Sequence, residues 1–480
     1  MISPRGPIPP AAGIRDDAPV RGLPGIGWFL TLVLGLGIAL PLHVSVGEVE
    51  LAAGIAEAVA VASIFLLLPA QFLADTGKPR LGGTTRLLVL GMVITSLASW
   101  ANGVLEQGFS LGALLSMLNW IALGGMVVLG QVLVGDLRRL GLLLGVWAAV
   151  QAAVAAGSVV YLVGRFGSSL VTATARGPFQ HAMHELLPSW PNEAGLAFAV
   201  AACLCFGRLR GGHRGLLLRA ELLVLTAGVL VTFSRNAWLA SFAGVLTIAV
   251  AARHRRGSLV LPVGAVVMVP LLALLLPPVR YQIASSWRPG TSEQLSLVAR
   301  LAFATEALRI WLDHPFLGVG FARFDQFASL GRLSTVASVA AGYVPGSVHN
   351  EYLSTLVKGG LVSAASFAAF LLASGWRFLG LARHAPPASQ GRPWGVVGLG
   401  LLAALVVGGF GGESFRHIAV SGPFWLLAGG LSVLGPIARR SRARRPLHGE
   451  QVTGALAAAR IDPASGYRHD SHRETGEPNG

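Results

Sequence analysis

Residues 344–370 are VPGSVHNEYLSTLVKGGLVSAASFAAF, and within this stretch the chain changes from polar to almost wholly apolar. The apolar part can begin a helix that crosses a bilayer, whose hydrocarbon core of about 30 Å needs roughly 20 apolar residues. His349, Asn350 and Glu351 stand directly before it. The stretch therefore predicts a membrane helix with a titratable cluster at its start.

The composition of the whole chain agrees with a membrane location. Of its 480 residues, 53% are hydrophobic and only 12% are charged, whereas a soluble domain carries about 25% charged residues. Such a chain cannot cover a surface that faces water. The net charge of +15 is explained by arginines in cytoplasmic loops and tails, so we do not expect nucleic acid as a partner.

Apolar runs recur along the sequence at lengths that suit membrane helices. The expected spans are 26–44, 51–74, 86–101, 111–134, 140–163, 193–207, 216–233, 237–252, 259–277, 352–374, 394–410 and 417–437. We therefore expect an all-α polytopic membrane protein with about twelve transmembrane helices.

These helices divide the chain into five parts. Residues 1–25 are a polar tail that enters the first apolar run without a cleavage site. Residues 26–277 hold nine helices, and 278–349 form one large outer loop that we expect to contain short helices. Residues 350–437 hold three further helices, and 438–480 are a basic tail with the composition of a disordered segment.

The charges of the loops indicate an orientation. If the N-terminus is cytoplasmic, the arginine-rich loops and the tail segment ARRSRARR at 438–445 all lie in the cytoplasm. The short outer loops VGEVE, NGVLEQG and GGES then carry acids and no Lys or Arg. This is the positive-inside pattern, and it predicts that both termini are cytoplasmic.

Within the large loop, Ser296 to Asp313 predicts an amphipathic helix. The apolar side chains that share one face at helical spacing are Leu297, Leu301, Ala304, Leu308 and Trp311. Arg300 lies at the edge of this face, and Pro315 ends the helix.

Several expected outer positions keep an arginine, although outer loops usually have few. They include Arg176, Arg235, Arg300 and Arg416. Arg235 lies in VTFSRNAWLA, a short turn between apolar runs, where an ionisable group is costly and indicates function. The alternative is an arginine that reaches the lipid head groups. Guanidinium groups bind phosphate oxygens in pairs, so converging outer arginines would suit the pyrophosphate of a lipid carrier.

His349 adds a proton acceptor that works near neutral pH. The alternative is a histidine at the membrane interface that solvent satisfies. Its neighbours Asn350 and Glu351 could simply cap the following helix.

The sequence offers little for a metal or a nucleotide. His181, His184 and Glu185 lie close together in QHAMHE but lack a further ligand. The chain contains no Asp-x-Asp and no Walker-type loop. We therefore expect neither a metal nor a cofactor.

Four segments together resemble the O-antigen ligase and polymerase family of bacterial envelope glycosyltransferases. They are ARGPFQHAMHELLPSWPNEAGLAFAV at 175–200, FSRNAWLA at 233–240, ARLAFATEALRIWLDHPFLGVGFARF at 299–324 and VHNEYLSTLVKGGLVS at 348–363. The last two are the specific ones. Lys358 departs from the neutral or acidic residue that the family has before the glycine.

The resemblance implies a metal-independent, inverting glycosyltransferase of the bacterial cytoplasmic (inner) membrane. Its donor would be a glycan on undecaprenyl pyrophosphate, its acceptor a lipid, glycan or protein hydroxyl, and its surroundings membrane lipids. His349 matches the essential histidine of the family, and Arg235 and Arg300 match arginines that engage the pyrophosphate. Arg176 matches a further basic position. We count Arg176, Asn350 and Glu351 as substrate-binding candidates.

Two alternatives stay open at the level of the sequence. A polysaccharide polymerase of the same family would use the same residues and a different acceptor. A transporter or flippase for a lipid-linked sugar would bind with the same arginines but need no base. It would carry ionisable groups deep in the membrane, where Glu57 is the main example here. We therefore favour the enzyme.

Overall fold

The computed structural model describes most of the chain. The described residues are Ile38, 43–46, 49–52, 55–73, 83–133, 137–167, 182, 191–213, 215–252, 277–285, 287–321, 327, 348–385 and 391–443. By contacts the chain divides into two units, 1–435 and 436–480. Within the second unit only residues 436–443 are described, and they continue the last helix.

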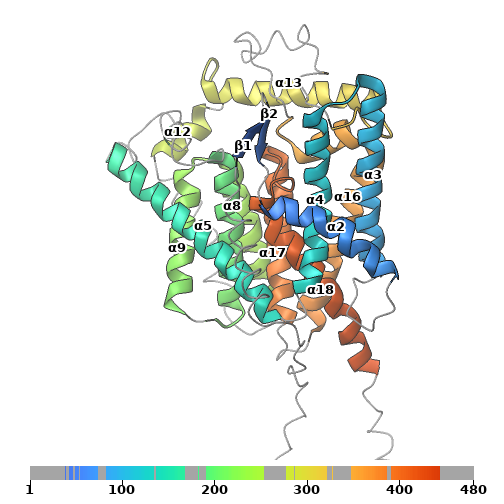
Figure 1. Ribbon diagram of the computed structural model, residues 1–480. Coiled ribbons are helices and arrows are strands. Elements are labelled where there is room, and N and C mark those ends of the chain that lie inside the picture. Colours follow the sequence, from blue (N-terminus) through green and yellow to red (C-terminus); the bar gives the residue numbers. More distant parts are fainter. Residues whose placement is uncertain are drawn as a thin grey trace, which may run out of the picture. The chain divides into compact units, whose positions relative to one another are not determined.

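Long helices make up most of the described part of the first unit (Figure 1). They are α2 (Ile55–Leu73), α3 (Gly83–Gln107), α4 (Leu111–Leu133), α5 (Leu137–Phe166), α8 (Pro191–Arg210), α9 (Leu216–Val231), α10 (Arg235–Ala251), α16 (Glu351–His384), α17 (Gly391–Gly411) and α18 (Ile418–Ala443). Each overlaps one of the expected spans, and α3 and α16 extend well beyond theirs. The expected span 259–277, except for Pro277, and nearly all of 26–44 lie outside the described residues.

Among the described residues, six helices are long and apolar enough to cross a membrane. They are α3, α4, α5, α8, α16 and α17, and shorter apolar helices cover 56–69, 235–251 and 418–432. The expectation of a polytopic helical membrane protein is therefore confirmed. The number of twelve spans and the large outer loop stay predictions.

A short hairpin is an addition that the sequence analysis did not expect. Strands β1 (His43–Val46) and β2 (Val49–Ala52) pair antiparallel, with His43 opposite Ala52. The segment HVSVGEVELA alternates apolar and polar residues around a glycine, which is the period of a strand and not of a helix.

The helices pack in a connected network. Helix α17 contacts α10, α16 and α8, α16 also contacts α3, and α2 packs on α4. Helix α9 contacts both α8 and α5. The packing brings the starts of α8, α10 and α16 and the connection between α17 and α18 into one region, which holds the candidate site.

Two helices follow α10 in the described part before α16 begins, α12 (Pro277–Ser285) and α13 (Ser292–Asp313). Helix α13 confirms the expected helix at 296–313, and Thr291 caps it by accepting a hydrogen bond from the Gln294 N–H at 3.3 Å. Its buried face differs from the expected one. Ala299, Phe303, Ala307 and Ile310 face the core.

On the expected face of α13, Leu301 is 62% exposed and Leu308 is 42% exposed. Apolar residues occur on two sides of this helix, so periodicity alone could not decide which side packs. The observed side meets Val319, Val348 and Val357.

Helix α16 is broken at Gly360, whose φ of 62° is left-handed. The segment after α13 fills the break. Val319 N–H and Gly320 N–H donate to the carbonyls of Val357 and Lys358 at 2.8 and 3.0 Å, and Leu361 N–H donates to the carbonyl of Pro315 at 2.8 Å. Backbone groups that the broken helix leaves free are thus paired. These hydrogen bonds connect the segment after α13 to α16, the helix that follows His349.

Candidate functional site

The start of α10 places Arg235. Ser234 caps the helix by accepting a hydrogen bond from the Ala237 N–H at 3.3 Å, and Phe233 before it has a left-handed φ of 51°. The Asn236 side chain donates to the carbonyl of Gly408 at 2.8 Å, which fixes this turn on α17. A helix N-terminus attracts anions through its free N–H groups and its dipole. Arg235 therefore adds a full positive charge where the backbone already favours an anion.

Helix α13 brings Arg300 to the same region. One of its terminal nitrogens, Nη1, donates to the carbonyl of Gly411 at 3.4 Å, at the end of α17. Burial and the positive charge of Arg235 lower the pKa of Arg300. The two arginines, which lie far apart in the sequence, are thus close enough to repel each other. An anion between them would relieve that repulsion.

His349 lies just before α16 with a left-handed φ of 53°. Asn350 holds it there as the helix cap, because its Oδ1 accepts from the N–H groups of Tyr352 and Leu353, both at 3.0 Å. The Asn350 amide also donates to the carbonyl of Phe410 at 3.1 Å. Asn350 is therefore confirmed as a cap, and its contact with substrate stays a prediction.

Positive charge surrounds His349. The His349 ring is partly open to solvent, yet enough protein lies around it for desolvation to lower its pKa. The charges of Arg300 and Arg416 lower this pKa further, while Glu193 acts in the opposite direction. A neutral imidazole at pH 7 follows, because the ordinary pKa of histidine is about 6.5. In this form the ring is ready to accept a proton.

Glu351 points into the connection between α17 and α18. Its carboxylate is fully buried and accepts from the Phe415 N–H at 2.8 Å, while its own N–H donates to the carbonyl of Gly412 at 3.2 Å. These bonds tie the connection to the start of α16. Glu351 has this structural role whatever it does in substrate binding.

The connection 412–417 supplies further site residues, Arg416, which the sequence analysis named only as one of the outer arginines, and His417, which it did not select. Arg416 forms an ion pair with Glu413, and His417 Nε2 lies 3.1 Å from Glu193 Oε1 at the start of α8. Burial lowers the pKa of both Arg416 and His417. The signal was present in GGESFRH, which holds an acid, an arginine and a histidine between two apolar helices.

Phe415 anchors this connection in the core. Its ring is fully buried and meets Phe367, Phe424 and Trp425 at centroid separations of 5.2, 5.9 and 6.1 Å. Its neighbour Arg416 is thereby held by packing as well as by charge.

Two groups of candidates lie outside the described residues. One is Arg176, and the other is the possible metal cluster of His181, His184 and Glu185. Within the part of the chain that the structure describes, no three His, Cys, Asp or Glu side chains are grouped as metal ligands. The described site is instead a base among guanidinium groups, an arrangement that can bind a doubly charged anion and accept a proton beside it.

One comparison with known proteins gives a match. Residues 220–368 match the family model described as O-antigen ligase. The matched segment contains Arg235, Arg300 and His349, and it agrees with the family that the motifs indicated. A comparison with curated proteins gives no match.

Proposed function

We propose, with the O-antigen ligase family as the premise, that this chain moves a glycan from undecaprenyl pyrophosphate to an acceptor hydroxyl at the outer face of the bacterial cytoplasmic membrane. The observation that carries the proposal is His349 placed among Arg300, Arg416 and Glu193 at the start of a membrane helix. The termini would lie in the cytoplasm, as the loop charges predict.

The arginines would hold the pyrophosphate. Arg235 and Arg300 are near neighbours, and the N-terminus of α10 adds backbone N–H groups. Guanidinium groups bind phosphate oxygens bidentately. As the bond between the anomeric carbon and the phosphate oxygen breaks, negative charge grows on the pyrophosphate, and fixed cations stabilise it in the transition state. Arg176 would add a further cation.

His349 would act as the general base. Its neutral ring accepts the proton of the acceptor hydroxyl while that oxygen attacks the anomeric carbon. The new glycosidic bond forms on the face opposite the departing pyrophosphate, so the anomeric centre inverts. The proton stays on His349 until the product leaves, and Glu193 stabilises the resulting imidazolium. This step needs neither a metal nor a nucleotide. We also propose that Asn350 and Glu351 contribute to substrate binding.

The two functions proposed for this family, ligase and polymerase, differ in their acceptor. A ligase would use a lipid or protein acceptor, and a polymerase would use a second lipid-linked glycan. The proposed chemistry at His349 is the same for both. The mass of the product separates them.

The first test is transfer by the purified chain in vesicles, with a lipid-pyrophosphate glycan pool from its own host. We expect His349→Ala to slow the release of lipid pyrophosphate by about 10²- to 10⁴-fold, the usual effect of a general base. His384→Ala is the matched control, because His384 lies exposed at the far end of the same helix. It should transfer at the parent rate.

Two outcomes would count against the enzyme. Transfer by His349→Ala at the parent rate would remove the proposed base. Movement of the donor across the bilayer without transfer, equal in parent and variant, would favour a transporter.

A further inference from the structure

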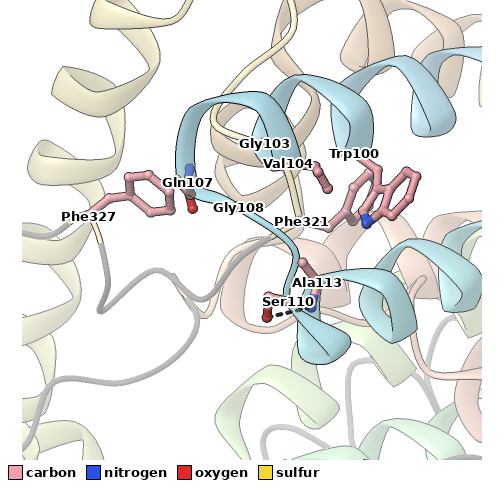
Figure 2. A pocket seen from close by; sticks show the side chains of 9 residues that line it. All are labelled: Trp100, Gly103, Val104, Gln107, Gly108, Ser110, Ala113, Phe321 and Phe327. Carbon is pink, nitrogen blue, oxygen red and sulfur yellow. Dashed lines mark hydrogen bonds between the residues drawn. The ribbon is translucent and has the colours of Figure 1, made fainter.

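A cavity of about 300 Å³ lies apart from the residues around His349 (Figure 2). It is bounded by the end of α3, the start of α4 and the segment that follows α13. Its volume is at the lower end of the range for pockets that hold small ligands. The site described above makes no use of it.

Aromatic side chains form much of its lining. Trp100 comes from α3, and Phe321 and Phe327 come from the segment after α13. Phe321 is held in place by Trp120, with ring centroids 6.5 Å apart. The indole N–H of Trp100 is buried and has no hydrogen-bond partner among the described residues. Because this nitrogen is not exposed, the indole would meet a ligand in the cavity with its ring and not with its N–H.

Polar groups stand beside the aromatic rings. The Gln107 side chain donates to the carbonyl of Val319 at 3.0 Å, so its amide is held in one orientation and its oxygen is an acceptor. The Ser110 hydroxyl accepts from the Ala113 N–H at 3.4 Å, as the dashed line in Figure 2 shows. A hydroxyl that accepts through its oxygen still has its proton to donate.

This mixture of groups suits a sugar ring better than a lipid chain. A pyranose has an apolar C–H face that stacks on an aromatic ring and an edge of hydroxyls that donate and accept. A lipid chain would cover the Gln107 amide oxygen and the Ser110 hydroxyl proton without offering either a partner, which is costly. The ligand that matches all of these side chains is therefore a saccharide.

The cavity is connected to the helix of His349 by hydrogen bonds. Asn102 and Gln107 on α3 donate to the carbonyls of Gly318 and Val319 at 3.1 and 3.0 Å. Val319 and Gly320 in turn donate to the broken part of α16. A ligand in the cavity would therefore contact the segment that connects α13 to α16.

We propose that this cavity is a glycan-binding subsite, which holds a sugar of the transferred glycan or of a glycan acceptor away from the reacting bond. The inference rests on the proposed function for its biological substrate. The binding of a saccharide by Trp100 and Phe327 is a property of the cavity itself and is tested without any transfer.

The test is saturation-transfer NMR on the full chain in nanodiscs. The probe is the oligosaccharide released by mild acid from the lipid-linked glycans of the host. Saturation of the protein's aromatic protons should reach the sugar protons in the parent and in His349→Ala. Phe327→Ala should weaken binding by about 2- to 10-fold, the range for one aromatic contact, and Ala113→Phe should block the cavity.

Leu105→Ala is the control, because Leu105 is 86% exposed on α3 and does not line the cavity. It should bind as the parent does. Absence of saturation transfer in the parent would overturn the proposal. Transfer in Phe327→Ala and Ala113→Phe as strong as in the parent would overturn it as well. Binding that depends on the cavity in a chain that transfers no glycan would support the subsite and reject the proposed function.

Kinetics identify which glycan occupies the subsite. If it holds the transferred glycan, Phe327→Ala raises the KM of a donor with a long glycan and leaves the KM of a donor with a single sugar unchanged. If it holds the acceptor, the KM of a glycan acceptor rises instead. A fall in kcat with both KM values unchanged would contradict the subsite.

Discussion

At the scale of single residues, the site is governed by charges that act on His349. Arg300 and Arg416 lower its pKa and Glu193 raises it. They come from α13, from the connection between α17 and α18, and from α8. Glu193 also pairs with His417, which Arg416, Glu57 and Lys358 face as well. Among the charges that act on His349, Glu193 is therefore the acid that opposes Arg300 and Arg416.

We predict that Glu193→Gln shifts the pH dependence of glycan transfer. The neutral form of His349 is the active base, so kcat/KM rises as pH passes the pKa of His349. Glu193 holds this pKa up, and its loss lowers it. The acid limb should therefore move to lower pH, which a profile of kcat/KM against pH would measure.

Glu106→Gln is the control for this prediction, because Glu106 lies on α3 near His314 and does not act on His349. Its profile should match the parent. An acid limb that stays in place in Glu193→Gln, or moves to higher pH, would show that Glu193 does not act on the base.

At the scale of elements, the break in α16 and the glycines of the HPFLGVGF segment belong together. Gly318 and Gly320 have left-handed φ values of 66° and 85°. A Cβ on Gly320 would lie 2.7 Å from the Cα of Gly103 on α3. The segment therefore needs glycine both for its backbone conformation and for its approach to α3.

We predict that Gly320→Ala destabilises the protein. The left-handed conformation costs a residue with a Cβ about 1–2 kcal/mol, and the contact with Gly103 adds to it. Thermal unfolding in detergent should show a lower Tm. Gly157→Ala on α5 is the matched control, since its Cβ would meet nothing within 4 Å, and its Tm should equal or exceed that of the parent. Equal Tm values for Gly320→Ala and the parent would contradict this account.

The same elements show where sequence patterns were sufficient. Helix α13 was expected from its periodicity, and it ends at Asp313 as expected but begins earlier, at Ser292. Its buried face was not expected. Phe303 and Ile310 are as apolar as Leu301 and Leu308, so the sequence does not show which pair is buried. The surface against which the helix packs decides this.

At the scale of the whole molecule, the expected orientation is open to direct measurement. Gly212, between α8 and α9, should lie in the cytoplasm, and Trp287, between α12 and α13, should lie outside. Both positions are exposed, whereas the native Cys203 and Cys205 are buried. An impermeant thiol reagent should thus label Trp287→Cys in intact spheroplasts and Gly212→Cys only after lysis. Labelling of both from one side would reject the topology.

The sequence by itself determined the membrane helices that the structure describes and the family motifs, because hydropathy, capping and turn residues are local properties of the chain. It also selected Arg235, Arg300 and His349. It named Arg416 only as one of the outer arginines, and it did not select Glu193, His417 or the cavity beside Trp100. These depend on which helix ends meet, and the energies that bring them together arise from packing between segments far apart in the chain. Only the tertiary structure could therefore decide which charges surround the base.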